Sequence, residues 1–318
     1  MRPLDRPPVP PLLVVGLGLL VTSTAAILIR FAQSYAASLV IATWRVGLAS
    51  LILAPILLSR HRAQLEALTR PQVALGLLSG VFLALHFATW IRSLALTTVA
   101  SSLVLVSTTP LFVALAAPVL LRERITRWVV AGLVLALIGA AGIGLSDACR
   151  WQAGLRCPPL SEFLRGRAIL GDALALLGAL TGGGYFMIGR RLRRDLPLLP
   201  YIGLSYTAAA LVLLLLTVLS DEPLVGYPAP AYGLFALLAL GPQLFGHSSL
   251  NWALRYLPVA FVSVALLAEP VGSTILALVI LGEVPGPLKV VSVMLVLAGI
   301  YMASRSVGSG RMAAEPAG

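Results

Sequence analysis

Long apolar runs alternate with short polar breaks along almost the whole chain. Runs of about 20 apolar residues are long enough to cross the hydrocarbon core of a bilayer as α-helices. Ten such runs cover residues 11–29, 36–58, 73–95, 100–121, 128–146, 169–189, 197–219, 231–254, 259–281 and 287–304. The breaks between them carry arginine or proline. The pattern therefore predicts an all-α integral membrane protein with ten transmembrane helices.

The arginines flank these runs unevenly and so predict an orientation. Placing the N-terminus in the cytoplasm puts 15 basic residues inside and seven outside, as the positive-inside rule requires. Both termini are then cytoplasmic, in a multi-pass protein of the plasma (inner) membrane. The first run follows Arg2 and Arg6 as a signal peptide would. It lacks a small-residue cleavage site and has a counterpart later in the chain, so we expect it to be a permanent span.

Composition points to lipid rather than water as the solvent. The 318 residues are 59% hydrophobic and 11% charged, with a mean hydropathy of +0.97, whereas soluble domains are about a quarter charged. The net charge of +11 raises the question of nucleic acid. The densest basic cluster, Arg190, Arg191, Arg193 and Arg194, directly follows an apolar run. We interpret it as a cytoplasmic anchor against the negative leaflet and expect no nucleic-acid partner.

The chain carries an internal repeat of 160 residues. At this offset, without gaps, several landmarks coincide: Gly18 with Gly178, Arg30 with Arg190, Val99 with Val259, Ala100 with Ala260, Pro110 with Pro270, Glu123 with Glu283 and Gly139 with Gly299. We therefore expect a first five-helix repeat over residues 1–147, an outer loop at 148–168, a second five-helix repeat at 169–304 and a cytoplasmic tail at 305–318.

An odd number of spans in each repeat makes the second half enter the membrane upside down. Two inverted repeats around a site near the midplane are common among secondary transporters that work by alternating access. The alternative is a static duplicated scaffold.

The two cysteines, Cys149 and Cys157, both fall in the expected outer loop. An oxidising compartment would allow a small disulfide-closed loop there, although two free thiols fit the sequence equally well. We predict the local disulfide. No group of residues in the chain has the spacing of a metal site, and no cofactor is expected.

The stretches around these landmarks resemble the drug/metabolite transporter superfamily, specifically its EamA-like branch. The resemblance covers residues 12–304 and is carried by Ala100-Ser101-Ser102, by Thr109 through Leu115, by Arg122-Glu123-Arg124, by Gly171-Asp172, by Glu269-Pro270-Val271 and by Leu281-Gly282-Glu283. It implies a ten-helix exporter of the inner membrane with a central cavity for amino acids, metabolites or drugs. The glycine triplet at 182–184 and Arg122 depart from the family's common pattern.

Charged residues inside spans are the first candidates for a transport role, because charge near the bilayer centre is costly unless it is paired or hydrated. Glu269 falls midway along the ninth run, directly before Pro270, whose ring and missing N–H weaken the helix. Arg45 lies near the middle of the second run. It would neutralise Glu269 or hold an anionic group of the substrate. A structural pair that fixes helix packing is the alternative.

Polar side chains at helical spacing mark three further faces. His86 and Trp90 are four residues apart in the third run, and Gln243, His247 and Asn251 follow the same spacing in the eighth. We expect these faces to line a hydrated cavity, where imidazoles would also take up protons. Polar contacts between helices are the alternative.

Tyr185 is a candidate aromatic wall of the pathway, although aromatic residues near span ends also serve as interfacial anchors. The adjacent Gly182, Gly183 and Gly184, together with Pro110 and Pro270, are candidate hinges. Glycine permits both local unwinding and close helix contact in a membrane, so simple packing is the alternative for the triplet.

These features together predict a secondary transporter that exports a small metabolite, amino acid or drug by alternating access. A membrane-embedded enzyme is one alternative, but the sequence has no HExxH, Walker A, GxSxG or dinucleotide motif. A channel or lipid scramblase is another. Without a nucleotide motif, uphill transport would draw on a proton, ion or solute gradient. The sequence leaves the number of subunits open.

Overall fold

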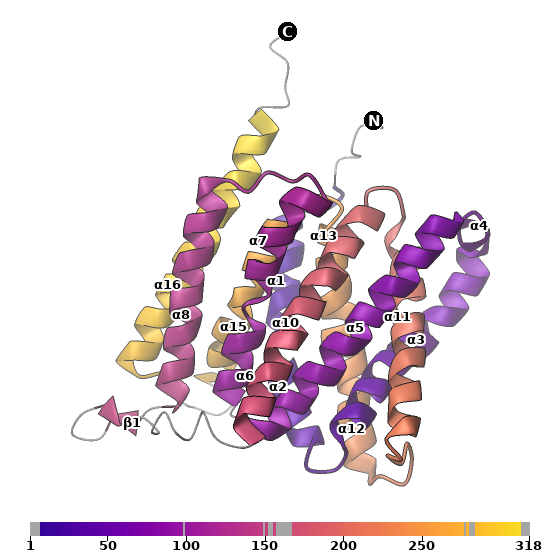
Figure 1. Ribbon diagram of the computed structural model, residues 1–318, viewed down its shortest axis with the longest axis horizontal. Helices are drawn as coiled ribbons and strands as arrows, with labels where there is room; N and C mark the ends of the chain where they lie inside the picture. Colours follow the sequence, from indigo (N-terminus) through magenta and orange to yellow (C-terminus); the bar gives the residue numbers. More distant parts are fainter. Residues whose placement is uncertain are drawn as a thin grey trace.

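Long apolar helices make up most of the computed structural model, which describes residues 7–97, 99–148, 150–151, 155–156, 167–276, 278–279 and 284–312 (Figure 1). Cys149, Cys157 and Glu283 lie outside the described residues, so the predicted disulfide stays a prediction. The first half of the chain forms α1 (Pro11–Thr22), α2 (Ala25–Ala32), α3 (Ser38–Arg60), α4 (Arg62–Glu66), α5 (Arg70–Leu96), α6 (Val99–Val106), α7 (Thr109–Leu120) and α8 (Arg127–Ala148).

The second half follows a two-stranded hairpin, in which β1 (Arg150–Trp151) pairs antiparallel with β2 (Leu155–Arg156). It contains α10 (Arg167–Leu192), α11 (Leu198–Leu219), α12 (Ala229–Leu238), the π-helix η1 (Ala239–His247), α13 (Ser248–Ala253), α14 (Val259–Ala265), the 3₁₀ turn η2 (Leu266–Ala268), α15 (Glu269–Leu276) and α16 (Pro287–Met312).

Membrane-length helices confirm the predicted fold class. Among the described residues, nine helices or helix pairs are long and apolar enough to cross a bilayer, and a shorter apolar stretch, Arg127–Ile143, occupies the place of the fifth predicted span. Leucine and valine side chains cover the outside of the bundle, which water would penalise and lipid accepts. The protein is therefore a multi-pass membrane protein.

Opposite ends of the bundle hold different features. The helix α1 begins and α16 ends at one end, which we call the termini end (Figure 1). The hairpin and the start of α10 lie at the other end, which we call the hairpin end (Figure 1). The first helices of the two halves therefore run in opposite directions.

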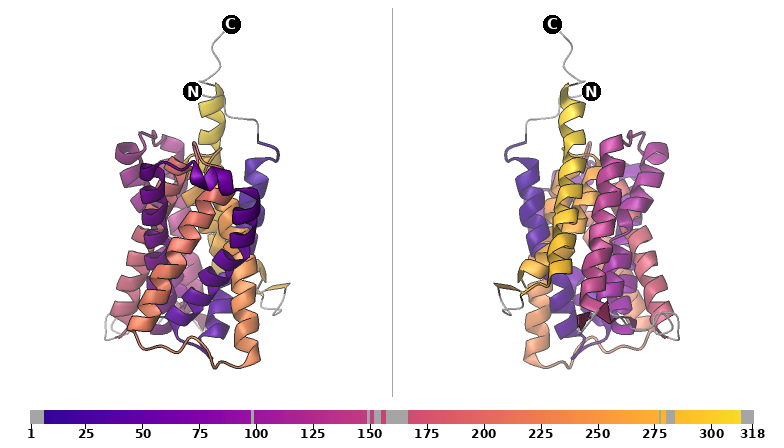
Figure 2. Two further views of the ribbon diagram at one scale, coloured as in Figure 1. Left: turned by 90° about the vertical axis from the view of Figure 1, so that its right-hand side faces the viewer. Right: turned by 90° about the vertical axis from the view of Figure 1, so that its left-hand side faces the viewer.

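Glycines bring helices into close contact at repeat-related positions. A Cβ at Gly18 would lie 2.8 Å from the Ser249 side chain, and a Cβ at Gly178 would lie 3.3 Å from Thr89 Oγ1. Both members of the first pair are 160 residues before or after their counterparts in the second. The long helices α8 and α16 also pack side by side (Figure 2), through the repeat-related Gly139 and Gly299. Small residues allow this approach of backbones.

Three spans are interrupted near their middle. The prolines Pro110 and Pro270 each occupy the second position of a new helix, α7 and α15, where a missing N–H costs nothing and the helix before them must stop. At the break between α1 and α2, the Ser23 hydroxyl donates back to the carbonyl of Leu19 at 2.7 Å. In contrast, α10 continues as one helix through the glycine triplet.

Candidate functional site

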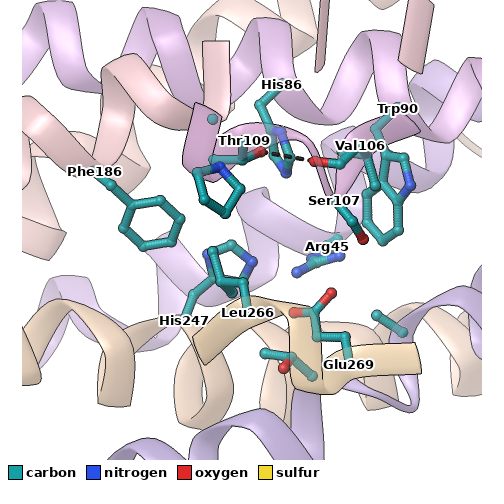
Figure 3. Close-up of a pocket in the computed structure, with 14 residues that line it drawn as sticks. Arg45, His86, Trp90, Val106, Ser107, Thr109, Phe186, His247, Leu266 and Glu269 are labelled. Carbon is teal, nitrogen blue, oxygen red and sulfur yellow. Dashed lines mark hydrogen bonds between the residues drawn. The ribbon is translucent and has the colours of Figure 1, made fainter. Parts of the chain in front are cut away.

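A small cavity lies where the interrupted spans of both halves meet, and we call it the central cavity (Figure 3). Its volume of about 50 Å³ has room for a few water molecules. Its lining consists of Thr22, Ala25, Arg45, His86, Trp90, Val106, Ser107, Thr109, Pro110, Gly182, Phe186, His247, Leu266 and Glu269. The chain breaks thus place polar groups inside a bundle whose outside is apolar.

Arg45 is the cation of the central cavity. Its side chain extends from α3 and is fully buried. The Nε–H donates to Gln243 Oε1 on η1 at 3.0 Å, and the guanidinium carbon lies 4.1 Å from the centre of the Phe87 ring, a cation–π contact. Nη1 has no hydrogen-bond partner among the described residues. Gln243 therefore holds the guanidinium from behind and leaves part of it free toward the cavity.

Glu269 is the anion of the same cavity. It is the first residue of α15, where the positive end of the helix dipole favours a carboxylate, and the Thr22 hydroxyl is a hydrogen-bond partner. Arg45 and Glu269 interact through their charges, but the ion pairs found among the described residues do not include them. Figure 3 shows both side chains pointing into the cavity from opposite helices.

Aromatic and imidazole rings complete the walls. His86 accepts or donates at Nδ1 to the Gly178 carbonyl at 2.8 Å and stacks on Trp90 with ring centres 5.9 Å apart. His247 stacks on Phe186 with ring centres 6.4 Å apart. Trp90 Nε1 and His247 Nδ1 are buried and lack hydrogen-bond partners among the described residues.

Other predicted site residues lie just outside the cavity, toward the termini end. Asn251 Nδ2 donates to the Tyr185 hydroxyl, and the Tyr206 hydroxyl lies 3.2 Å from Ser248 Oγ. All four side chains are buried. They form a packed polar layer between the central cavity and the termini end.

The termini end is closed by a contact between the two halves. Arg190 Nε donates to Glu123 Oε1 at 2.5 Å, and Glu123 Oε2 accepts the backbone N–H of Val259 at 3.1 Å. Arg190 Nη1 donates to the carbonyl of Leu254 at 2.6 Å. We call this group the termini-end latch. At the hairpin end, Arg30 Nη1 donates to the carbonyl of Leu94 at 2.8 Å, which repeats the Arg190–Leu254 contact at the 160-residue offset.

Only part of the basic cluster after α10 faces outward. Arg191 and Arg194 are exposed, but Arg193 is 2% exposed and donates to the carbonyl of Asn251 at 3.1 Å. Burial lowers the pKa of Arg193 to about 10, which leaves it charged at neutral pH. The interpretation of the whole cluster as a leaflet anchor is therefore wrong for Arg193, because helix packing turns this side chain inward.

Comparison with known proteins now bears on this geometry. A model of the EamA-like transporter family matches the chain twice, over residues 10–145 and 169–305. The chain belongs to the EamA-like transporter family. This membership confirms the resemblance inferred from the sequence, and each half of the chain is one copy of the family's unit.

Two relatives extend the comparison. The EamA-like chain is 28% identical over 218 residues to a probable terminal-alkyne amino-acid exporter from Streptantibioticus cattleyicolor, covering 67% of this chain and 66% of that protein. A solved crystal structure superposes with a TM-score of 0.74 at 20% identity, over 93% of this chain and 97% of the other. This second likeness concerns the fold alone. Family and exporter together support a transporter of small molecules.

Within this EamA-like transporter, the structure brings together most of the predicted site. Arg45, His86, Trp90, His247 and Glu269 line the central cavity, as do Pro110 and Gly182. Gln243, Asn251 and Tyr185 support it from behind, and Pro270, Gly183 and Gly184 are buried beside it. The sequence analysis missed Phe186, Thr109 and the latch residue Glu123. The only signal for Glu123 was its repeat-related partner at position 283.

Proposed function

We propose that this protein is a secondary transporter that exports a small metabolite, amino acid or drug by alternating access through the central cavity. The observation that carries the proposal is a cavity holding Arg45 and Glu269 at the breaks of both repeats. Charges at that depth are costly in a lipid-surrounded bundle unless a solute or water meets them. We place the protein in the inner membrane with both termini in the cytoplasm, as its arginine distribution favours.

The asymmetry of the two ends supports alternating access. The termini-end latch joins Glu123, Arg190 and Val259 across the halves, and the repeat supplies Arg30 and Leu94 for a related arrangement at the hairpin end. Residues 1–147 and 169–304 are proposed as the two moving units, with the chain breaks at Pro110 and Pro270 as bending points. A proton, taken up by Glu269 or an imidazole of the cavity, is the proposed coupling ion.

Counterflow in proteoliposomes tests this function. Vesicles containing the purified protein are loaded with a mixed panel of amino acids and metabolites, and uptake of each labelled compound is measured at two pH values. Saturable uptake that is accelerated by the same unlabelled compound inside is expected. Flux that rises linearly with concentration and shows no acceleration would support a channel instead. Chemical conversion of a panel member by the pure protein would support an enzyme.

A further inference from the structure

Unpaired polar atoms cluster at the central cavity. Arg45 Nη1, Trp90 Nε1 and Gln243 Nε2 have no hydrogen-bond partner among the described residues, and all three side chains are at least nine-tenths buried. Most buried polar groups in proteins have a partner, so several orphans at one place indicate that something else binds there. Arg45 and Trp90 line the cavity, and Gln243 is bonded to Arg45.

The chemistry of these orphans selects an anion. A guanidinium nitrogen and an indole nitrogen only donate, and the free Nε2 of Gln243 also donates. A carboxylate has two oxygens that accept several hydrogen bonds at once, and it compensates the charge of a guanidinium. Water would satisfy the donors but would leave the Arg45 charge uncompensated in a buried place.

The opposite wall of the cavity selects a cation. Glu269 faces the cavity beside Thr22 and forms no ion pair with Arg45 among the described contacts. Two unlike charges that share a cavity without touching leave space for a molecule that carries both charges. An ammonium group meets the Glu269 carboxylate while the carboxylate of the same molecule meets Arg45.

The rest of the lining limits the third substituent. Val106, Pro110, Phe186 and Leu266 present apolar surface to the cavity, and Arg45 and Glu269 are the two acidic or basic (Asp, Glu, Lys or Arg) side chains in its described lining. A third charge on the solute would therefore find no compensating group. We infer that the central cavity binds small zwitterions with an uncharged apolar substituent, as in neutral α-amino acids, with Arg45 and Trp90 at the carboxylate and Glu269 at the ammonium.

This inference rests on the proposed function only for its name of substrate, because binding is measured without transport. The assay is ligand-induced stabilisation and calorimetric binding of the purified full-length protein with four probes. Norvaline carries both charges and an apolar chain. Norvaline amide lacks the carboxylate, N-acetylnorvaline lacks the ammonium, and lysine adds a third charge.

The expected result is binding of norvaline and at least about tenfold weaker binding of each of the other three, since a lost charged hydrogen bond changes affinity by about that factor. Arg45→Gln should abolish the preference for norvaline over its amide and keep the preference over N-acetylnorvaline. Glu269→Gln should do the reverse. Arg92→Gln and Glu66→Gln, which remove an exposed charge each, should change neither preference.

Equal binding of norvaline, its amide and its N-acetyl derivative to the wild-type protein would overturn the inference, and this comparison needs no variant to fold. Variants that fold and keep both preferences would overturn the assigned roles. Norvaline binding without counterflow of any panel member would leave the site and refute the transporter. Counterflow of solutes that lack one of the charges, with no norvaline binding, would leave the transporter and refute the zwitterion site.

Discussion

The termini-end latch offers a direct test of how the closed end is held. Glu123 accepts from Arg190 Nε at 2.5 Å and from the Val259 N–H at 3.1 Å, and its side chain is 11% exposed. Glu123→Gln keeps an acceptor and the shape of the side chain but removes the negative charge. The substitution therefore isolates the charge-assisted part of the contact.

The expected magnitude follows from this burial. A hydrogen bond to a charged group contributes about 1.5–3 kcal/mol, and about 1.4 kcal/mol corresponds to a tenfold change in a population. Because Arg190 keeps its bond to the Leu254 carbonyl, we take the low end of that range. The population open at the termini end should then rise about tenfold.

A reporter cysteine measures that population. In a protein with Cys149 and Cys157 replaced by serine, Ala253→Cys places a thiol at a fully buried position of α13 close to the latch. Its modification by a water-soluble maleimide should proceed about tenfold faster when Glu123→Gln is added, in proportion to the open population. Glu66→Gln, an exposed carboxylate in an i,i+4 pair, is the matched control. An unchanged labelling rate in folded Glu123→Gln protein would refute this account of the closed end.

Three further predictions concern packing, the site and orientation. Gly18→Val should lower the unfolding temperature in detergent by overpacking of about 1–3 kcal/mol, because its Cβ would lie 2.8 Å from Ser249, whereas Gly16→Val, with open space around it, should not; equal melting temperatures would contradict the close contact. Gln243→Leu should destabilise the protein by about 1.5–3 kcal/mol, since it leaves Arg45 Nε without its acceptor, and Gln243→Glu, which keeps an acceptor, should lose less in the same unfolding assay. A protease-sensitive tag at either terminus should be cleaved only from the cytoplasmic side of membrane vesicles, and cleavage from outside would reverse the proposed orientation.

Much of the fold could be predicted from the sequence because its signals are local. A run of apolar residues must satisfy its own backbone hydrogen bonds in lipid, so it becomes a helix whatever its neighbours are. The paired Pro110 and Pro270 mark helix starts at repeat-related positions for the same reason. Helical spacing also placed His86 with Trp90 on one face.

The partners of these residues were decided only by the tertiary structure. Arg45 and Gln243 are 198 positions apart in sequence, and nothing in either span says that their helices touch. Helical spacing likewise could not tell whether Arg45 and Glu269 form a closed pair or face each other across a cavity. The glycine triplet shows the same limit, because α10 stays helical where side chains of neighbouring helices fill the space, such as His86 against Gly182.

The sequence by itself thus determined which segments cross the membrane, that the chain is a duplication and which polar residues lie within spans. The packing of helices decided which of those residues meet, which end is closed and which donors stay unpaired. The physical reason is that hydropathy and backbone hydrogen bonding act within a segment, whereas charge pairing and cavity shape depend on distances between segments that lie far apart in the chain.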